Sequence, residues 1–339
     1  MKAAWTGPVL VADVGGTHVR FALVDIAAEC PLIADSARRY RAAEFASFDA
    51  AVQRYLDECG TRPAALVIAA AGVVAEGEVR LTNNVPWVIS RAATEAAFGF
   101  GEVALLNDFA AMALSVPLLQ PGDLHSVGAP QPTAFDLRSK QTFAILGAGT
   151  GLGVGALIVR DGHAHALETE GGHASFAPGN SEEVEIYRRL AARFGRVSHE
   201  RVLCGSGLVN LYAALAEIGG VEAEFSAPEQ ITAAADTDPL CRRALEVFCE
   251  QLGSVAGDLV LTFGAWDGVY VAGGLAPLLT RWIESGGFRQ RFEEKGRLSP
   301  AVARVPTSVV QHVDPGLLGA AAWAMIAAGK LGATGRKAS

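Results

Sequence analysis

The sequence predicts an α/β fold with two domains of related topology and a cleft between them. The chain has 339 residues, which corresponds to about two domains of ordinary length. Strand-like and helix-like patterns alternate along it. A strand, a glycine-rich turn and a second strand open each half, at residues 9–23 and again at 143–159. This weak internal repeat predicts that the halves are built alike.

Composition indicates a compact globular protein. Half of the residues are hydrophobic and 19% are charged, enough for a large core. The net charge of −8 and the lack of a long basic run argue against nucleic acid or a membrane as partner. No stretch has the pattern of a signal peptide or the length of a membrane span. The five cysteines are widely spaced without C-x-x-C, which favours reduced thiols. We therefore expect a cytoplasmic protein.

The first half opens on two strands of period two, in which Val9 and Val11 precede the glycines and Phe21 and Leu23 follow them. The remaining patterns predict a third strand at 38–41, a helix at 48–59, a buried strand at 64–71, a short helix at 94–98, a strand at 103–106 and a helix at 109–115. The predicted helix at 109–115 ends before Pro117, because a residue that precedes a proline disfavours the helical conformation.

Residues 120–140 are rich in glycine, proline and polar side chains, which predicts a surface excursion at a domain boundary. Beyond it we expect strands at 143–146 and 154–159 around a turn at 147–153, helices near 182–194, 207–216 and 239–262, a strand at 269–272 and a helix at 315–328. The last helix is apolar on most faces and must be packed. The predicted domains are a small one, residues 1–118 plus 312–334, and a large one, residues 119–311.

Both glycine turns predict phosphate binding, because backbone N–H groups without side chains approach an anion closely. No G-x-x-x-x-G-K-[ST] is present, and Leu152 stands where G-x-G-x-x-G needs its third glycine. Each turn also leads into a strand, whereas both of those sites need a helix N-terminus. Hairpin turns without a ligand are the alternative. Two such turns favour a nucleotide polyphosphate held between related domains.

The residues predicted at the nucleotide belong to these turns. Thr17 and Thr150 supply hydroxyl hydrogen bonds, and the carboxylate of Asp13 is suited to hold the hydration shell of Mg²⁺. The set is Asp13, Gly15, Gly16, Thr17, Gly149, Thr150 and Gly151.

Five motifs occur along the chain, in this order: Asp13-Val14-Gly15-Gly16-Thr17, Leu106-Asn107-Asp108-Phe109, Gly147-Ala148-Gly149-Thr150-Gly151-Leu152-Gly153, Glu170-Gly171-Gly172-His173 and Val271-Ala272-Gly273-Gly274. The same order is seen in bacterial glucokinases, and the chain resembles that family, in its enterobacterial type, from residue 9 to about 328. The resemblance implies a two-domain actin-like ATPase (ribonuclease H-like) fold, a homodimer, and phosphorylation of D-glucose to glucose 6-phosphate by Mg²⁺ and ATP, feeding glycolysis. The repressor/kinase group of sugar kinases usually carries a cysteine-rich zinc site, which this chain lacks.

By the resemblance, Asp108 is the general base for the hydroxyl on carbon 6. Its position alone, after a buried strand and before a helix, favours a helix N-cap, whereas Asn107 beside it and the phosphate loops elsewhere favour catalysis. Asn107 is expected to bind sugar hydroxyls through its amide, which both donates and accepts.

Glu170 and His173 flank two glycines that let a sugar approach the backbone, and Glu200 is the family's further sugar carboxylate. For Glu200, an ordinary surface carboxylate is a competing interpretation. Gly273 and Gly274 resemble the family's adenosine contact.

Other functions remain open. The chain can be a kinase for another hexose, or an actin- or chaperone-like ATPase that acts on a protein partner. The second alternative has no need of Glu170, His173 and Glu200. ADP and polyphosphate are alternative donors. Asn83 and Trp87 resemble a family loop near the cleft, and we expect Trp87 to face it.

Overall fold

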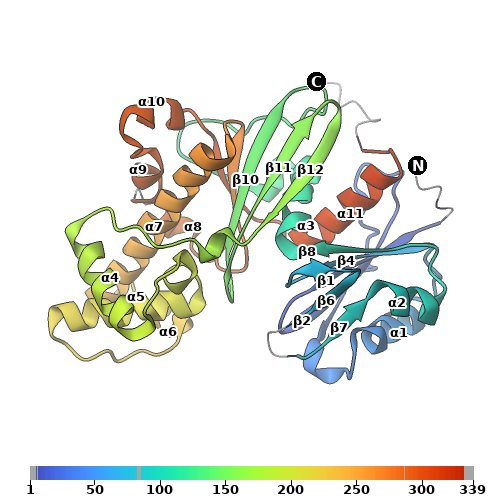
Figure 1. The fold of residues 1–339 in the computed structure, drawn as a ribbon, viewed down its shortest axis with the longest axis horizontal. Helices are drawn as coiled ribbons and strands as arrows, with labels where there is room; N and C mark the ends of the chain where they lie inside the picture. The colour runs from blue at the N-terminus through green and yellow to red at the C-terminus, as the bar shows by residue number, and fades with distance from the viewer. Residues whose placement is uncertain (1–4, 6, 82–84, 286, 332–339) are drawn as a thin grey trace.

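The computed structural model of the chain describes residue 5 and residues 7–81, 85–285 and 287–331. In this part of the chain two mixed β-sheets, of five and six strands, form the framework. Figure 1 shows the first sheet with its helices at one end, the second sheet in the middle and a group of helices at the other end. The predicted α/β class is confirmed.

The first sheet has the order β3-β2-β1-β4-β8. Its strands are β1 (Val9–Val14), β2 (His18–Val24), β3 (Arg38–Arg41), β4 (Ala65–Ala70) and β8 (Val103–Asn107). The hairpin β1–β2 is antiparallel, whereas β1, β4 and β8 run parallel. All of these strands were predicted, to within a residue or two at their ends.

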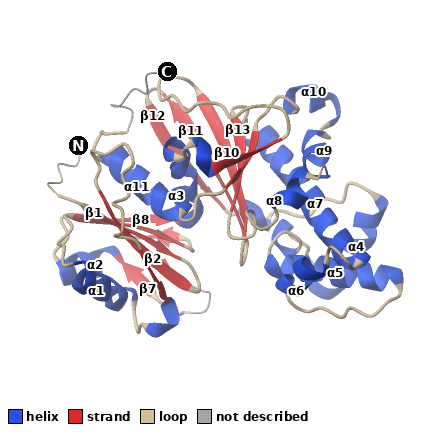
Figure 2. Cartoon of the chain, turned by 180° about the vertical axis from the view of Figure 1, so that it is seen from behind, coloured by secondary structure: helices blue, strands red, loops and turns tan. Residues whose placement is uncertain are grey.

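Alternation along β1 explains how both faces of this sheet are covered. Val9 and Val11 pack into one buried cluster with α3 (Asp108–Ser115) and α11 (Pro315–Ala327). Leu10 and Ala12 point the other way, into a cluster with α1 (Phe48–Cys59). Figure 2 shows α1 and α2 (Arg91–Phe98) on one side of the sheet and α3 and α11 on the other. As predicted, α11 is packed on most faces.

The second sheet has the order β12-β11-β10-β13-β14-β9. Its strands are β10 (Gln141–Ala148), β11 (Leu152–Arg160), β12 (His163–Thr169), β13 (Gly268–Ala272), β14 (Thr307–Val310) and β9 (Leu124–Val127). An antiparallel meander, β10–β11–β12, is followed by β13 and β14 parallel to β10. The first five strands therefore repeat the order and directions of the first sheet.

The remaining elements surround these sheets. A small sheet contains β5 (Val74–Ala75), β6 (Glu78–Arg80) and β7 (Val88–Ser90). The helices beyond the second sheet are α4 (Ser181–Phe194), α5 (Gly205–Gly219), α6 (Pro228–Ala234), α7 (Pro239–Phe263), α8 (Thr280–Glu284), α9 (Gly287–Glu293) and α10 (Ser299–Val302). Short 3₁₀ turns are Ala42–Glu44, Val116–Leu118, Pro121–Asp123, Gly171–His173, His199–Arg201 and Gly296–Leu298.

Three sequence predictions are wrong in part. Residues 120–140 are not wholly a surface excursion, because β9 pairs antiparallel with β14 and forms one edge of the second sheet. The glycine turn is shorter than predicted: β10 and β11 run through both ends of the motif and leave only residues 149–151 between them. Trp87 does not face a cleft; it is 4% exposed and packs edge-on against Phe48. Asn83 lies outside the described residues.

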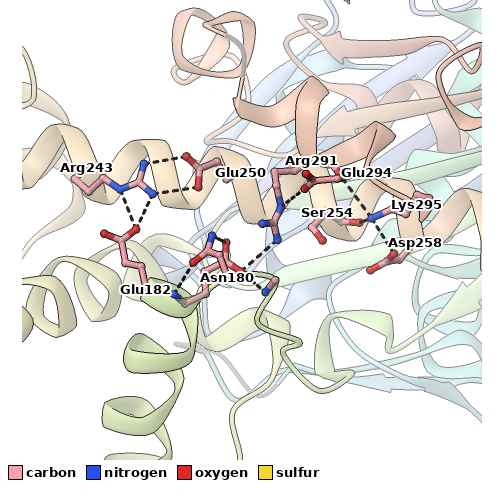
Figure 3. Close-up of polar contacts among 11 residues, drawn as sticks. Asn180, Glu182, Arg243, Glu250, Ser254, Asp258, Arg291, Glu294 and Lys295 are labelled. Atoms are coloured by element: carbon pink, nitrogen blue, oxygen red, sulfur yellow. Dashed lines mark hydrogen bonds and ion pairs between the residues drawn. The ribbon is translucent and has the colours of Figure 1, made fainter. Parts of the chain in front are cut away.

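Ion pairs fasten α4 to α7 and α9 (Figure 3). The carboxylate of Glu183, in the first turn of α4, is fully buried and accepts a hydrogen bond from Arg291 of α9 at 3.2 Å. Asn180 caps α4 and also donates to Glu183. Arg243 of α7 bridges Glu182 and Glu250. These contacts fix the first turn of α4.

Replacing Arg291 with Met is expected to lower the free energy of unfolding by about 3–5 kcal/mol, because it leaves the carboxylate of Glu183 buried without its cation. Urea unfolding followed by circular dichroism measures the change. Arg188→Met is the matched control, since Arg188 pairs with Glu185 at the surface and such pairs contribute about 0–1 kcal/mol. Equal losses in the two variants would contradict a structural role for the buried pair.

Candidate active site

A cavity of about 1170 Å³ lies between the two sheets. The hairpins β1–β2 and β10–β11 line it from either side, together with the start of α3, the loop from β4 to β6 and the turns that follow β12 and β13. Single small-molecule sites measure about 300–1,000 Å³, so this cavity is slightly larger than that range.

Most of the residues predicted from sequence meet in this cavity. Those lining it are Asp13, Gly15, Gly16, Asn107, Asp108, Gly149, Thr150, Gly151, Glu170, His173, Glu200 and Gly273. Thr17 and Gly274 are not among its lining residues; Thr17 is exposed at the tip of the first hairpin.

Asn107 and Asp108 occupy the junction of β8 and α3. Asn107 is the N-cap of α3, and its Oδ1 accepts hydrogen bonds from the backbone N–H groups of Phe109 and Ala110 at 2.9 and 3.2 Å. Its Nδ2 donates to the carbonyl of Gly72 at 3.2 Å. The capping role considered for Asp108 therefore belongs to Asn107. This leaves Asn107 little free capacity beyond one amide hydrogen.

Asp108 is the first residue of α3, and its carboxyl group is set up to exchange a proton near neutral pH. Burial raises its pKa to about 7, and the negative charge of Asp13 adds to the rise. Hydrogen bonds from backbone N–H groups, including that of Phe109, oppose the shift, whereas the charge of Glu170 adds to it more weakly. A carboxylate with such a pKa is a suitable general base.

Arg20 was not predicted as a site residue, yet it organises the first hairpin. Its Nη1 donates to Oδ2 of Asp13 at 2.8 Å, and its Nε lies 3.1 Å from Oδ1 of Asp314, which precedes α11. Burial raises the pKa of Asp13, and the neighbouring guanidinium opposes this effect. The sequence held a signal for the first contact, because residues 13 and 20 are directly opposite in the β1–β2 register.

Glu200 is not an isolated surface carboxylate. Its Oε2 accepts a hydrogen bond from the backbone N–H of Leu152 at 3.0 Å, where β11 begins. A Cβ atom at Gly151 would lie only 2.5 Å from this oxygen. Glu200 thus rests against the second glycine turn and connects the predicted sugar residues to the predicted phosphate loop.

Glu170 and His173 stand at the open side of the cavity, with side chains 64% and 58% exposed. Their side chains lie 3.9 Å apart. The backbone behind them is held firmly: Arg196 donates to the carbonyl of His173 at 2.6 Å, and the N–H of His199 donates to that of Ala174 at 2.9 Å. These two side chains are therefore accessible groups on an anchored backbone.

Gly273 brings the end of β13 against the second hairpin. Its φ of +86° is in the left-handed region, and a Cβ atom there would lie 2.6 Å from the carbonyl oxygen of Ala148. That oxygen accepts from the N–H of Leu275 at 3.1 Å. Only glycine permits this approach, which keeps a bare backbone surface at the cavity.

The small sheet and its first turn add charged residues that sequence reasoning missed: Glu76, Glu78 and Arg80.

Within the described residues, no group of three His, Cys, Asp or Glu side chains is placed to ligate a metal ion. No helix in the same part of the chain is long and apolar enough to cross a membrane. All five cysteines are unpaired, and three of them are buried.

The chain is similar to known proteins over most of its length. The family model described as glucokinase matches residues 10–327. A glucokinase of Stenotrophomonas maltophilia is 49% identical over 318 residues, which cover 94% of this chain and 95% of the relative.

Two solved structures extend the comparison to three dimensions. The crystal structure of glucokinase from an Antarctic psychrotroph is 33% identical and superposes with a TM-score of 0.84, covering 94% of this chain and 98% of that one. A ROK family glucokinase from Streptomyces griseus, in complex with glucose and AMPPNP, is 21% identical with a TM-score of 0.62, covering 93% and 98%. Sugar kinases of the ROK family have the actin-like ATPase fold.

Proposed function

The chain belongs to the glucokinase family, and on this premise we propose that the cavity between its sheets is the active site in which ATP phosphorylates glucose. The protein is an ATP-dependent sugar kinase that acts on glucose. One observation carries the assignment of the site: a carboxyl group with a pKa near 7, Asp108, shares a cavity with both glycine hairpins.

In the proposed reaction Asp108 accepts the proton of the hydroxyl on carbon 6. The hydroxyl oxygen forms a bond to the γ-phosphorus of ATP as the bond from that phosphorus to the β–γ bridging oxygen breaks. The products are glucose 6-phosphate and ADP, and the proton is left on Asp108. Asn107, Glu170, His173 and Glu200 would hold the remaining hydroxyls and fix the orientation of the sugar.

The phosphates would lie against the bare backbone of Gly15-Gly16 and Gly149-Thr150-Gly151, with the adenosine near Gly273-Gly274. Thr17 would add a hydroxyl contact if the tip of the first hairpin moves inward. Mg²⁺ fits this arrangement, because it favours a few carboxylate oxygens together with water and phosphate. The carboxylate of Asp13 would hold it through water, and the ion would neutralise charge on the phosphates.

We further propose that residues 1–118 plus 312–334 and residues 119–311 are domains, and that the cavity is the cleft between them. Each contains one of the two related sheets. Limited proteolysis, with cleavage near residues 119 and 311, tests these boundaries. As the family resemblance implies, we propose a cytoplasmic homodimer, and light scattering coupled to size-exclusion chromatography tests the dimer.

The decisive assay measures ADP release with Mg²⁺, ATP and a panel of hexoses. We expect slow hydrolysis of ATP alone and rapid turnover with glucose, with the phosphate on carbon 6. Faster turnover with mannose or glucosamine would favour the alternative hexose kinase. ADP release that no hexose accelerates would exclude a sugar kinase and favour an ATPase that acts on a protein partner.

Glu170→Gln is expected to raise the KM for glucose about 10- to 100-fold while the KM for ATP changes little. A hydrogen bond to a charged group contributes about 1.5–3 kcal/mol, and the neutral amide loses much of it. Initial rates at varied glucose and varied ATP separate the two constants. Glu222→Gln, on the exposed surface away from the cavity, is the matched control. A change confined to the KM for ATP would move Glu170 to the nucleotide side.

A further inference from the structure

The side chain of Phe109, next to the proposed base, enters the second glycine hairpin. Gly147 of β10 and Gly153 of β11 are directly opposite each other in the strand register. A Cβ atom at Gly153 would lie 1.8 Å from the Phe109 ring, and one at Gly147 would lie 2.9 Å from it. The ring therefore occupies a window that only a pair of glycines leaves open.

The glycines of this motif therefore have two different roles: some form the turn, and others make room for the Phe109 ring. The sequence predicts phosphate binding from Gly149 and Gly151, and these are the two glycines of the motif that lie in the turn between the strands. Gly155 also serves α3, because a Cβ atom there would lie 3.2 Å from the carbonyl oxygen of Phe109. Three glycines of β10 and β11 thus receive the start of α3.

The helix that carries Phe109, α3, also packs closely against α11. α3 contacts β10, β11 and β12 of the second sheet and packs along α11, which covers the first. A Cβ atom at Gly319 of α11 would lie 1.6 Å from the carbonyl oxygen of Ala111. Figure 2 shows α3 between the two sheets, beside α11. Asp108 therefore stands at the end of an element that both halves of the molecule hold.

We propose that Phe109 is a positioning residue: its ring, seated between Gly147 and Gly153, couples the nucleotide hairpin to Asp108. The inference rests on the proposed role of Asp108 as base. The ring locks the N-terminus of α3 to the two strands whose connecting turn holds the phosphates. Any displacement of that turn is thus transmitted to the carboxylate. The window sets the separation between proton acceptor and phosphoryl donor.

The competing interpretation is that Phe109 only fills space. A filler residue contributes to stability and leaves turnover unchanged, whereas a positioning residue changes kcat, because a misplacement of about 1 Å can cost on the order of a hundredfold in rate. The two interpretations differ in kcat at saturating substrates, not in thermal stability.

The first test is Phe109→Leu, which shortens the group in the window. We expect kcat to fall about 10- to 100-fold, with both KM values within about threefold of the wild type. Phe143→Leu is the matched control, since Phe143 is fully buried on β10, lies on the same face and does not line the cavity. We expect Phe143→Leu to lose at least as much thermal stability as Phe109→Leu and to keep its kcat within about twofold of the wild type.

A second variant changes one of the two glycines and leaves Phe109 in place. Gly153→Ala places a methyl group where the ring lies, so it is expected to lower kcat with Phe109 in place. In Phe109→Leu/Gly153→Ala the smaller side chain makes room for that methyl group. We therefore expect the loss of kcat in the double variant to be at least threefold smaller than the product of the losses of kcat in the two single variants.

Three results would overturn the proposal. One is a normal kcat in Phe109→Leu together with lowered thermal stability, which would make the ring a filler. A second is strict multiplication of the losses in the double variant. The third comes from Asp108→Asn in the same assay: if that variant keeps its activity, the proposed base fails and no carboxylate is left to position. Loss of activity in Asp108→Asn with normal turnover in Phe109→Leu would reject the positioning role alone.

Discussion

Replacing Asp108 with Asn is expected to lower kcat by about 10²- to 10⁴-fold, because the amide keeps the size of the side chain but cannot accept the proton. Glucose should still bind, since the other sugar residues and the hydrogen bond between Asn107 and Gly72 are unchanged. ADP release measures the first effect, and calorimetric titration with glucose measures the second. Near-normal turnover would make Asp108 a structural residue.

The same variant is expected to be more stable than the wild type at pH 8. The pKa of Asp108 is about 7 in the folded chain and near 3.8 when exposed, so folding is disfavoured progressively as the pH rises from about 4 to 7. At pH 8 the ionised, buried carboxylate costs up to about 4 kcal/mol, which the amide avoids. At pH 4 the two proteins should differ little. A variant that loses both activity and stability at pH 8 would contradict this account.

The long periodic elements could be predicted from sequence because the local pattern determines them. α1, α4 and α7 begin and end within about a residue of the predicted positions, each behind a side chain that caps its first turn. The glycine hairpins could also be predicted from sequence, since alternating apolar residues flank each turn. These features need no knowledge of distant parts of the chain.

Elements that depend on distant partners were missed. β9 contains His125 and Ser126 and has no strong strand pattern; it is a strand because it pairs with β14, some 180 residues later. The position of Trp87 failed for a similar reason. Its neighbours in sequence do not indicate which side of the small sheet it takes, and packing against Phe48 decides this.

The candidate site shows the same division. Asp108 and Glu170 follow from motifs and Glu200 from the family resemblance, and the structure brings all three to one cavity. The pairing of Asp13 with Arg20 could have been predicted from hairpin register, whereas the contact of Arg20 with Asp314 spans most of the chain. A glycine's role, whether for phosphate or for packing, cannot be decided until the register shows what lies opposite.

The kcat/KM of the wild type for glucose is expected to fall about tenfold for each pH unit below about 7, reaching a loss of about 100-fold at pH 5 relative to its value at high pH. Only the ionised form of Asp108 can accept the proton, and burial and the charge of Asp13 place its pKa at about 7 in the free protein. The profile of kcat/KM reports groups of the free enzyme, so it is the quantity to measure. Below the pKa, the ionised fraction falls tenfold per unit.

Variants identify the group behind this profile. The residual activity of Asp108→Asn should be flat from pH 5 to 8, and His173→Gln should keep the wild-type midpoint, because the imidazole is not the proton acceptor. Asp13→Asn removes a negative charge that raises the pKa of Asp108, so it should move the midpoint to lower pH in whatever activity remains. A midpoint that disappears in His173→Gln, or that Asp13→Asn leaves in place, would show that the fall in activity comes from another group or that the pKa of Asp108 has another cause.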